Sequence, residues 1–154
     1  MDTSEILRTQ LSRLLGHSDA HADFDATVAG IAPKTRGTRP AGLPHSPWEL
    51  LEHIRLAQRD ILEFCQDGAY VERAWPEDYW PSAPEPPSPE AWDESVMAVQ
   101  RDREEFQRLI ADPTVDLFST VPHGTEQTYL REVLVAADHN AFHVGQLMVV
   151  RRLL

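Results

Sequence analysis

The sequence has few cysteines, few basic residues and no long apolar run, and each shortage excludes a class of protein. Its 154 residues include one cysteine, Cys65, so an intramolecular disulfide framework and a multi-cysteine zinc or iron–sulfur site are excluded. No apolar run approaches the roughly 18–20 residues that a membrane-spanning helix needs. The opening residues MDTSEILRTQ lack the basic and apolar regions of a signal peptide. We therefore expect a cytoplasmic protein that does not enter a membrane.

Basic residues number 14 against 25 acidic ones, which gives a formal net charge of −11 and a pI near 4.9. An acidic protein repels a polyanion and lacks the basic footprint that releases counterions from nucleic acid. We therefore expect no nucleic-acid partner. A small anionic ligand is not excluded, because a bound cation can dominate the field close to it.

Hydrophobic periodicity and capping residues predict helices through most of the chain. The clearest start lies at Ser46, where Pro47 suits the first helical position and Glu49 completes a Ser-x-x-Glu capping box. Four helices are predicted, over residues 2–16 with a continuation over 19–31, 46–67, 88–111 and 128–154.

A proline-rich segment divides these helices into two pairs. Residues 76–90 hold six of the 12 prolines and cannot be helical, because each proline removes a donor and disfavours helix at the residue before it. Neither flank is long enough for a good core of its own, so we interpret the segment as a connector inside one domain of residues 1–154. The long connections predict an all-α antiparallel bundle with a crossover.

The last predicted helix carries two histidines four residues apart, His139 and His143. At this spacing both imidazoles leave the same face, where they can bind one cation at nitrogen–metal distances near 2.0–2.1 Å. Apolar neighbours such as Val135, Phe142 and Leu147 predict that this face is partly buried. Buried neutral imidazoles need partners, and a shared cation would satisfy both. Two ordinary polar or core imidazoles are the alternative interpretation.

His53 lies on the inner stripe of the second predicted helix. Taken alone, it is a core histidine with a hydrogen-bond partner. Together with His139 and His143 it would form a three-nitrogen site with open positions for water or substrate, although spacing alone leaves open whether the helices bring the three together. Asn140 stands where the His-Glu-x-x-His motif of metalloproteases has its glutamate, which disfavours the mechanism of that class.

Two segments, Gly42–Phe64 and Asp138–Leu154, resemble the metal-site helices of the DinB-like (DinB/YfiT) superfamily of metal-dependent four-helix proteins, with weaker support from His21–Phe24. The resemblance implies an up-down-down-up four-helix bundle, often a homodimer. It also implies a divalent metal, zinc or nickel, held by one histidine of the second helix and two of the fourth.

Carried over to this chain, the metal ligands implied by the resemblance are His53, His139 and His143. Characterised relatives include transferases and isomerases that use the metal to activate a low-molecular-weight thiol. We therefore expect a metal-dependent enzyme of thiol-dependent S-transferase type, acting on a small-molecule substrate. A metal-dependent hydrolase and a non-enzymatic metal-binding dimer are the alternatives, and the lack of a convincing general base disfavours hydrolysis.

Several polar residues have two interpretations each. Asp60, seven residues after His53, and Asp138 could each orient a ligand imidazole, or they could face solvent or cap a helix. Gln146 could reach the cavity or form a helix-packing hydrogen bond. His21 and His45 could line the bundle mouth or serve as loop residues.

For the remaining reactive or aromatic side chains we expect a structural role. Cys65 lies too far along its helix to join the metal site and has no activating neighbour, so we expect an inert, buried thiol. His17 and His123 are expected at the surface. Four aromatic residues could wall a pocket, but we expect them to anchor the connector: Trp75, Tyr79, Trp80 and Trp92.

Overall fold

The computed structural model describes residues 2–16, 19–66 and 68–154. This part of the chain is helical, and its only extended pairing is an isolated bridge between Thr120 and Thr128, so the all-α prediction is confirmed. None of its helices is long and apolar enough to cross a membrane. The elements are α1 (Thr3–Gly16), α2 (Phe24–Ala29), η1 (Pro33–Thr35), α3 (Pro47–Gln66), η2 (Glu77–Tyr79), α4 (Pro89–Ala111) and α5 (Tyr129–Leu153), where η marks a 3₁₀ helix.

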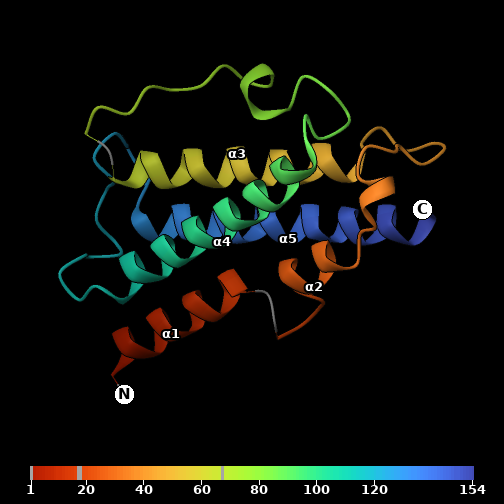
Figure 1. Ribbon diagram of the computed structural model, residues 1–154. Helices are drawn as coiled ribbons and strands as arrows, with labels where there is room; N and C mark the ends of the chain where they lie inside the picture. Colours follow the sequence, from red (N-terminus) through yellow and green to blue (C-terminus); the bar gives the residue numbers. More distant parts are fainter. Residues whose placement is uncertain (1, 17–18, 67) are drawn as a thin grey trace.

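The long helices pack side by side, with α3 in contact with both α4 and α5 (Figure 1). Helix α1 packs against α4 and α5, and the short α2 lies on α5. Buried apolar side chains form two clusters, one around Phe106 and Leu62 and the other around Ile54 and Leu147. Both clusters draw on α3 and α5, so these two helices share a continuous buried contact.

Side-chain caps begin the long helices close to the predicted residues. The Ser46 hydroxyl accepts a hydrogen bond from the backbone N–H of Glu49 at 3.2 Å, and the Glu49 carboxylate accepts one from the N–H of Ser46 at 2.8 Å. This is the reciprocal pairing of a capping box. Ser88 caps α4 and Thr128 caps α5.

Around α2 the structure differs from the prediction. A helix over residues 19–31 was expected, but α2 covers only Phe24–Ala29. The carboxylate of Asp23 accepts a hydrogen bond from the N–H of Ala26 at 2.7 Å, which begins the helix there and leaves the preceding residues outside it. The apolar stripe is nevertheless placed as expected, because Phe24, Val28 and Ile31 are all buried.

The proline-rich connector runs along α3, above that helix in the view of Figure 1. The 3₁₀ helix η2 packs on α3, and the hydroxyl of Ser46 donates a hydrogen bond to the carbonyl of Pro84. Trp92, at the start of α4, is buried beneath the guanidinium of Arg36, whose carbon lies 4.7 Å from the ring centroid. The connector is therefore part of the packed structure.

Glu49 should contribute to stability in a way that depends on pH. Burial raises the pKa of its carboxyl, but hydrogen bonds from Arg39 and Ser46 outweigh this effect and hold the pKa below its usual range. We predict that Glu49→Gln lowers the free energy of unfolding at pH 7 by about 1 kcal/mol, the scale of a helix cap. Because a lowered pKa stabilises the fold above the ordinary carboxyl pKa, the difference should vanish as pH falls through the lowered value.

Urea unfolding of both proteins from pH 7 to pH 3 measures this difference, with Glu126→Gln on an exposed carboxylate as the control. A stability gap between Glu49→Gln and the wild type that persists unchanged at the acid end would contradict the proposed role of the carboxylate.

Candidate metal centre

Three histidines from two helices meet at the contact between α3 and α5. His53 comes from α3, His139 and His143 come from α5, and one nitrogen of each lies within 4.8 Å of the others. The Nε2 atoms of His53 and His139 are 3.1 Å apart. Two nitrogens bound to one cation at about 2.0–2.1 Å are separated by about 2.8–3.4 Å between adjacent positions of octahedral or tetrahedral geometry. The separation of His53 and His139 therefore fits a shared divalent ion, and the three histidines lie close enough together that they could hold one.

Burial keeps these imidazoles neutral at pH 7. His53 is 2 % and His143 is 8 % exposed, whereas His139 is half-buried. Desolvation is the main cause that lowers the pKa of His53 and of His143 to about 4, and it also lowers the pKa of His139. A neutral imidazole offers a lone pair, so the three rings are in the state that binds a cation.

Hydrogen bonds at the other ring nitrogens orient two of the rings. The Nδ1–H of His53 donates to the backbone carbonyl of Tyr79 at 2.8 Å, and a carbonyl can only accept, so Nε2 keeps its lone pair. The Nδ1–H of His143 faces the side-chain oxygen of Gln146 at 2.6 Å. His139 has only a long contact, 3.4 Å, to the side-chain oxygen of Asn140. Orientation is therefore strongest for His53 and His143.

An aromatic side chain of the connector covers the site. The ring of Trp80 lies parallel to that of His53, with centroids 3.9 Å apart and 3° between the planes. His45 also stacks on Trp80, at 4.1 Å and 14°. Trp80 and His45 thus wall the site, while Trp75 is largely exposed and Trp92 is buried away from the histidines, against Arg36.

Asp60 does not contact an imidazole but is not solvent-facing either. It is buried, and its carboxylate accepts hydrogen bonds from the hydroxyls of Tyr79 at 2.6 Å and Tyr70 at 3.1 Å. The group that directly orients His53 is the Tyr79 carbonyl, which sequence reasoning missed. A backbone carbonyl in an irregular segment has no signature in the sequence. Asp138, by contrast, is exposed.

The face of α5 that carries His139 and His143 is partly buried, as predicted, because His143 is buried and His139 is half-buried. Leu147 is fully buried, and the ring of Phe142 meets that of His143 edge-on with centroids 5.0 Å apart. Phe142 is nevertheless 62 % and Val135 36 % exposed, because α5 also carries apolar side chains on its outer face. His21 and His123 are exposed, and His17 lies outside the described residues.

One cleft borders the histidine cluster at His139, and a second is lined by residues next to the cluster. One, of ≈ 660 Å³, is lined by His139 together with Leu134 and Phe142. The other, of ≈ 330 Å³, is lined by His45 and Gln146. The site can therefore be approached from outside through the first cleft, whose lining is largely apolar.

The chain matches the profile of the DinB superfamily over residues 17–147. The chain belongs to the DinB superfamily. The match contains all of α3 and both histidines of α5, which confirms the superfamily resemblance predicted from two segments. No curated protein and no solved structure matches the chain significantly.

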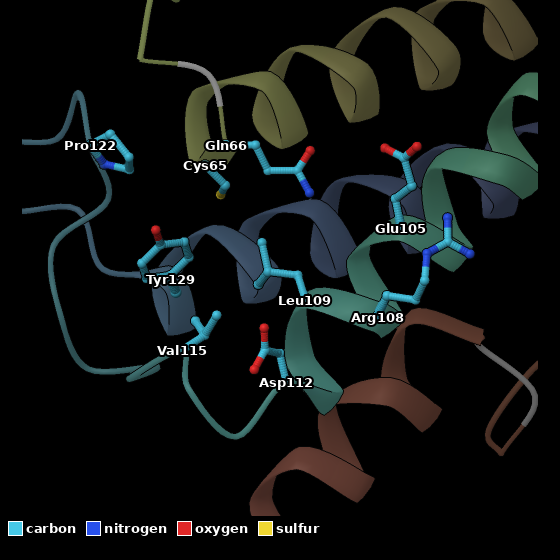
Figure 2. A pocket seen from close by; sticks show the side chains of 9 residues that line it. All are labelled: Cys65, Gln66, Glu105, Arg108, Leu109, Asp112, Val115, Pro122 and Tyr129. Carbon is cyan, nitrogen blue, oxygen red and sulfur yellow. The ribbon is translucent and has the colours of Figure 1, made fainter.

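Cys65 lies in a separate cleft at the end of α3, shown in Figure 2. This cleft, of ≈ 530 Å³, contains no histidine and is bordered by Tyr129 and by Glu105 and Arg108 of α4. The cysteine itself is buried, and burial raises the pKa of its thiol to about 12. The expectation of a buried thiol is confirmed.

We predict that Cys65 is chemically inert in the folded protein. At pH 8 its thiol should react with Ellman's reagent at less than about a hundredth of the rate of the same chain unfolded in guanidinium, because the thiolate is the reactive form. The absorbance of the released thionitrobenzoate measures both rates. One thiol equivalent reacting in the folded protein as fast as in the unfolded chain would contradict this expectation.

Proposed function

We propose that this DinB-superfamily protein is a metal-dependent enzyme of thiol-dependent S-transferase type. In this proposal His53, His139 and His143 hold one divalent ion, zinc or nickel. The observation that carries the proposal is the approach of three neutral imidazole nitrogens, two from buried rings and one from a half-buried ring, to within 4.8 Å of one another. Three imidazoles leave the charge of the ion uncompensated and leave coordination positions for another ligand.

The chemistry that a divalent ion supplies at such a site is a lowered pKa of a thiol or water that it coordinates. The chain's own residues orient the imidazoles that would bind the ion. Tyr79 and Gln146 orient two imidazoles through Nδ1, and Trp80 covers one side of His53. The cleft beside His139 offers an apolar wall to the organic part of a small-molecule substrate.

The contacts around the histidines favour transfer over hydrolysis. Hydrolysis needs a general base beside the nucleophile, but the Nδ1 atoms of the three rings contact a backbone carbonyl and the side-chain amides of Asn140 and Gln146. A coordinated thiol needs no further activation by the protein. The cleft next to His139 also supports an enzyme over a closed structural metal site.

We also propose the up-down-down-up bundle topology for α1, α3, α4 and α5. The course of the ribbon in Figure 1 supports it, because α3 and α4 run from right to left in that view and α1 and α5 from left to right. The connector between α3 and α4 then returns the chain along the bundle, as a crossover does.

A homodimer is part of the proposal. Its support is the exposed apolar side chains near the end of α5, which include Val149 and Leu153. Exposed apolar side chains grouped in this way are typical of a surface that another protein covers. A cytoplasmic location and the absence of a nucleic-acid partner remain predictions that rest on the sequence and its net charge of −11.

We predict about one divalent ion per chain in protein loaded with zinc or nickel and then dialysed, measured by elemental analysis. His139→Ala should lose at least about nine-tenths of this metal, because two remaining imidazoles bind too weakly to survive dialysis. His21→Ala, on an exposed histidine outside the cluster, is the matched control and should keep it. Full metal content in His139→Ala would contradict the proposed metal site.

A thiol should enter the coordination sphere of the cobalt-substituted protein. We expect 2-mercaptoethanol or cysteine to produce a thiolate-to-cobalt charge-transfer band in the near ultraviolet, because a soft thiolate binds an open position of the ion. Ethylene glycol and serine, the matched alcohols, should leave the spectrum as it is. An unchanged spectrum across a panel of small thiols would count against S-transfer while leaving the metal site itself intact.

A further inference from the structure

We propose that Asp60 is a positioning residue of the metal centre, which acts on His53 through Tyr79. Asp60 holds the hydroxyl of Tyr79, and the backbone carbonyl of the same tyrosine fixes the Nδ1 proton of His53. This inference rests on the proposed function, in which the Nε2 lone pair of His53 binds the metal.

The two ends of Tyr79 contact α3 at residues two turns apart. Its carbonyl accepts the Nδ1–H of His53 at 2.8 Å, and its hydroxyl donates to Oδ2 of Asp60 at 2.6 Å. Residues seven apart lie on the same face of a helix, about 10 Å from each other along the axis. One connector residue therefore spans this face and is held at both ends.

The neighbouring residue restrains the same ring in a second way. Trp80 stacks on His53 with 3° between the planes, which defines the plane of the imidazole. The Tyr79 carbonyl defines which nitrogen carries the proton. The two groups belong to adjacent residues of the connector. A contact that fixes Tyr79 in place therefore also fixes the carbonyl and the indole ring that restrain His53.

Asp60 is suited to this anchoring because it is buried and saturated with donors. Its Oδ1 atom accepts from the Tyr70 hydroxyl at 3.1 Å and pairs with the Arg73 guanidinium at 3.3 Å. A carboxylate is a stronger hydrogen-bond acceptor than a neutral oxygen. Burial raises the pKa of both tyrosines, so that each stays a donor at pH 7.

Asp60 could instead be an anchor of the connector with no effect on the metal centre, and the chain offers a matched pair of variants that separates these roles. Tyr79→Phe and Tyr70→Phe each remove one hydroxyl from the same carboxylate. Only Tyr79 also contacts His53. Asp60→Asn provides a third variant, which weakens both hydrogen bonds.

The experiment combines two measurements on the full chain. The first is the tautomer of His53 in metal-free protein, obtained from the ¹⁵N shifts of the labelled ring. The second is cobalt affinity, from competition with a chromophoric chelator. We expect the wild type to carry the proton on Nδ1. Tyr79→Phe and Asp60→Asn should populate the Nε2–H form and lower cobalt affinity about 10-fold, the usual scale for lost support of a ligand, while Tyr70→Phe should stay within about twofold of the wild type.

The outcomes separate this inference from the proposed function. Wild-type affinity and an unchanged tautomer in both Tyr79→Phe and Asp60→Asn would overturn the positioning role and leave the metal site standing. An equal loss of cobalt affinity in Tyr70→Phe and Tyr79→Phe would also overturn it. Asp60 would then support the connector as a whole and would not act on His53 through Tyr79. If the wild type binds no cobalt, the proposed function fails, and the ¹⁵N shifts of the metal-free variants alone decide whether Asp60 positions His53.

Discussion

Three imidazoles share one small buried space because α3 packs directly along α5. Two of them stand a turn apart on α5, and the third faces them from α3, so the separation of these two helix axes sets the distances from His53 to the other two rings. Burial removes the water that would otherwise satisfy the rings and holds them in the neutral state. The same packing therefore creates both the geometry and the protonation state that a cation needs.

Next to the histidines, a short series of buried amides ties the helices together. The Asn140 side chain of α5 donates to the side-chain oxygen of Gln58 on α3 at 2.6 Å, and the Gln58 amide in turn donates to the carbonyl of Val99 on α4 at 2.8 Å. Both amide side chains are buried, so each bond would be costly to lose. We infer that this series holds the three helices in register beside the site. The role of Asn140 is then structural and not catalytic.

Much of this arrangement could be predicted from the sequence because it depends on local rules. The capping box at Ser46 and the caps at Ser88 and Thr128 act over three residues, so the starts of α3, α4 and α5 were predicted closely. The four-residue spacing of His139 and His143 likewise sets their common face. The proximity of His53 needed the superfamily resemblance, since it depends on how α3 meets α5.

Features that depend on irregular backbone could not be predicted in this way. The Tyr79 carbonyl is a main-chain atom in a proline-rich segment, and nothing in its side chain signals that it faces an imidazole. Asp60 had two interpretations, contacting an imidazole or facing solvent. It does neither, because it is buried against the hydroxyls of Tyr70 and Tyr79, which follow α3 in the chain. The exposure of Phe142 escaped prediction because α5 is apolar on its outer face as well.

The most direct test of the central claim is a crystal structure of the zinc- or nickel-loaded protein with anomalous diffraction recorded on both sides of the metal's absorption edge. We predict one anomalous peak per chain at about 2.0–2.1 Å from a nitrogen of each of His53, His139 and His143. A peak bound by other residues, or an ordered triad of histidines with no peak among them at full metal loading, would contradict the claim that these three side chains form the metal centre.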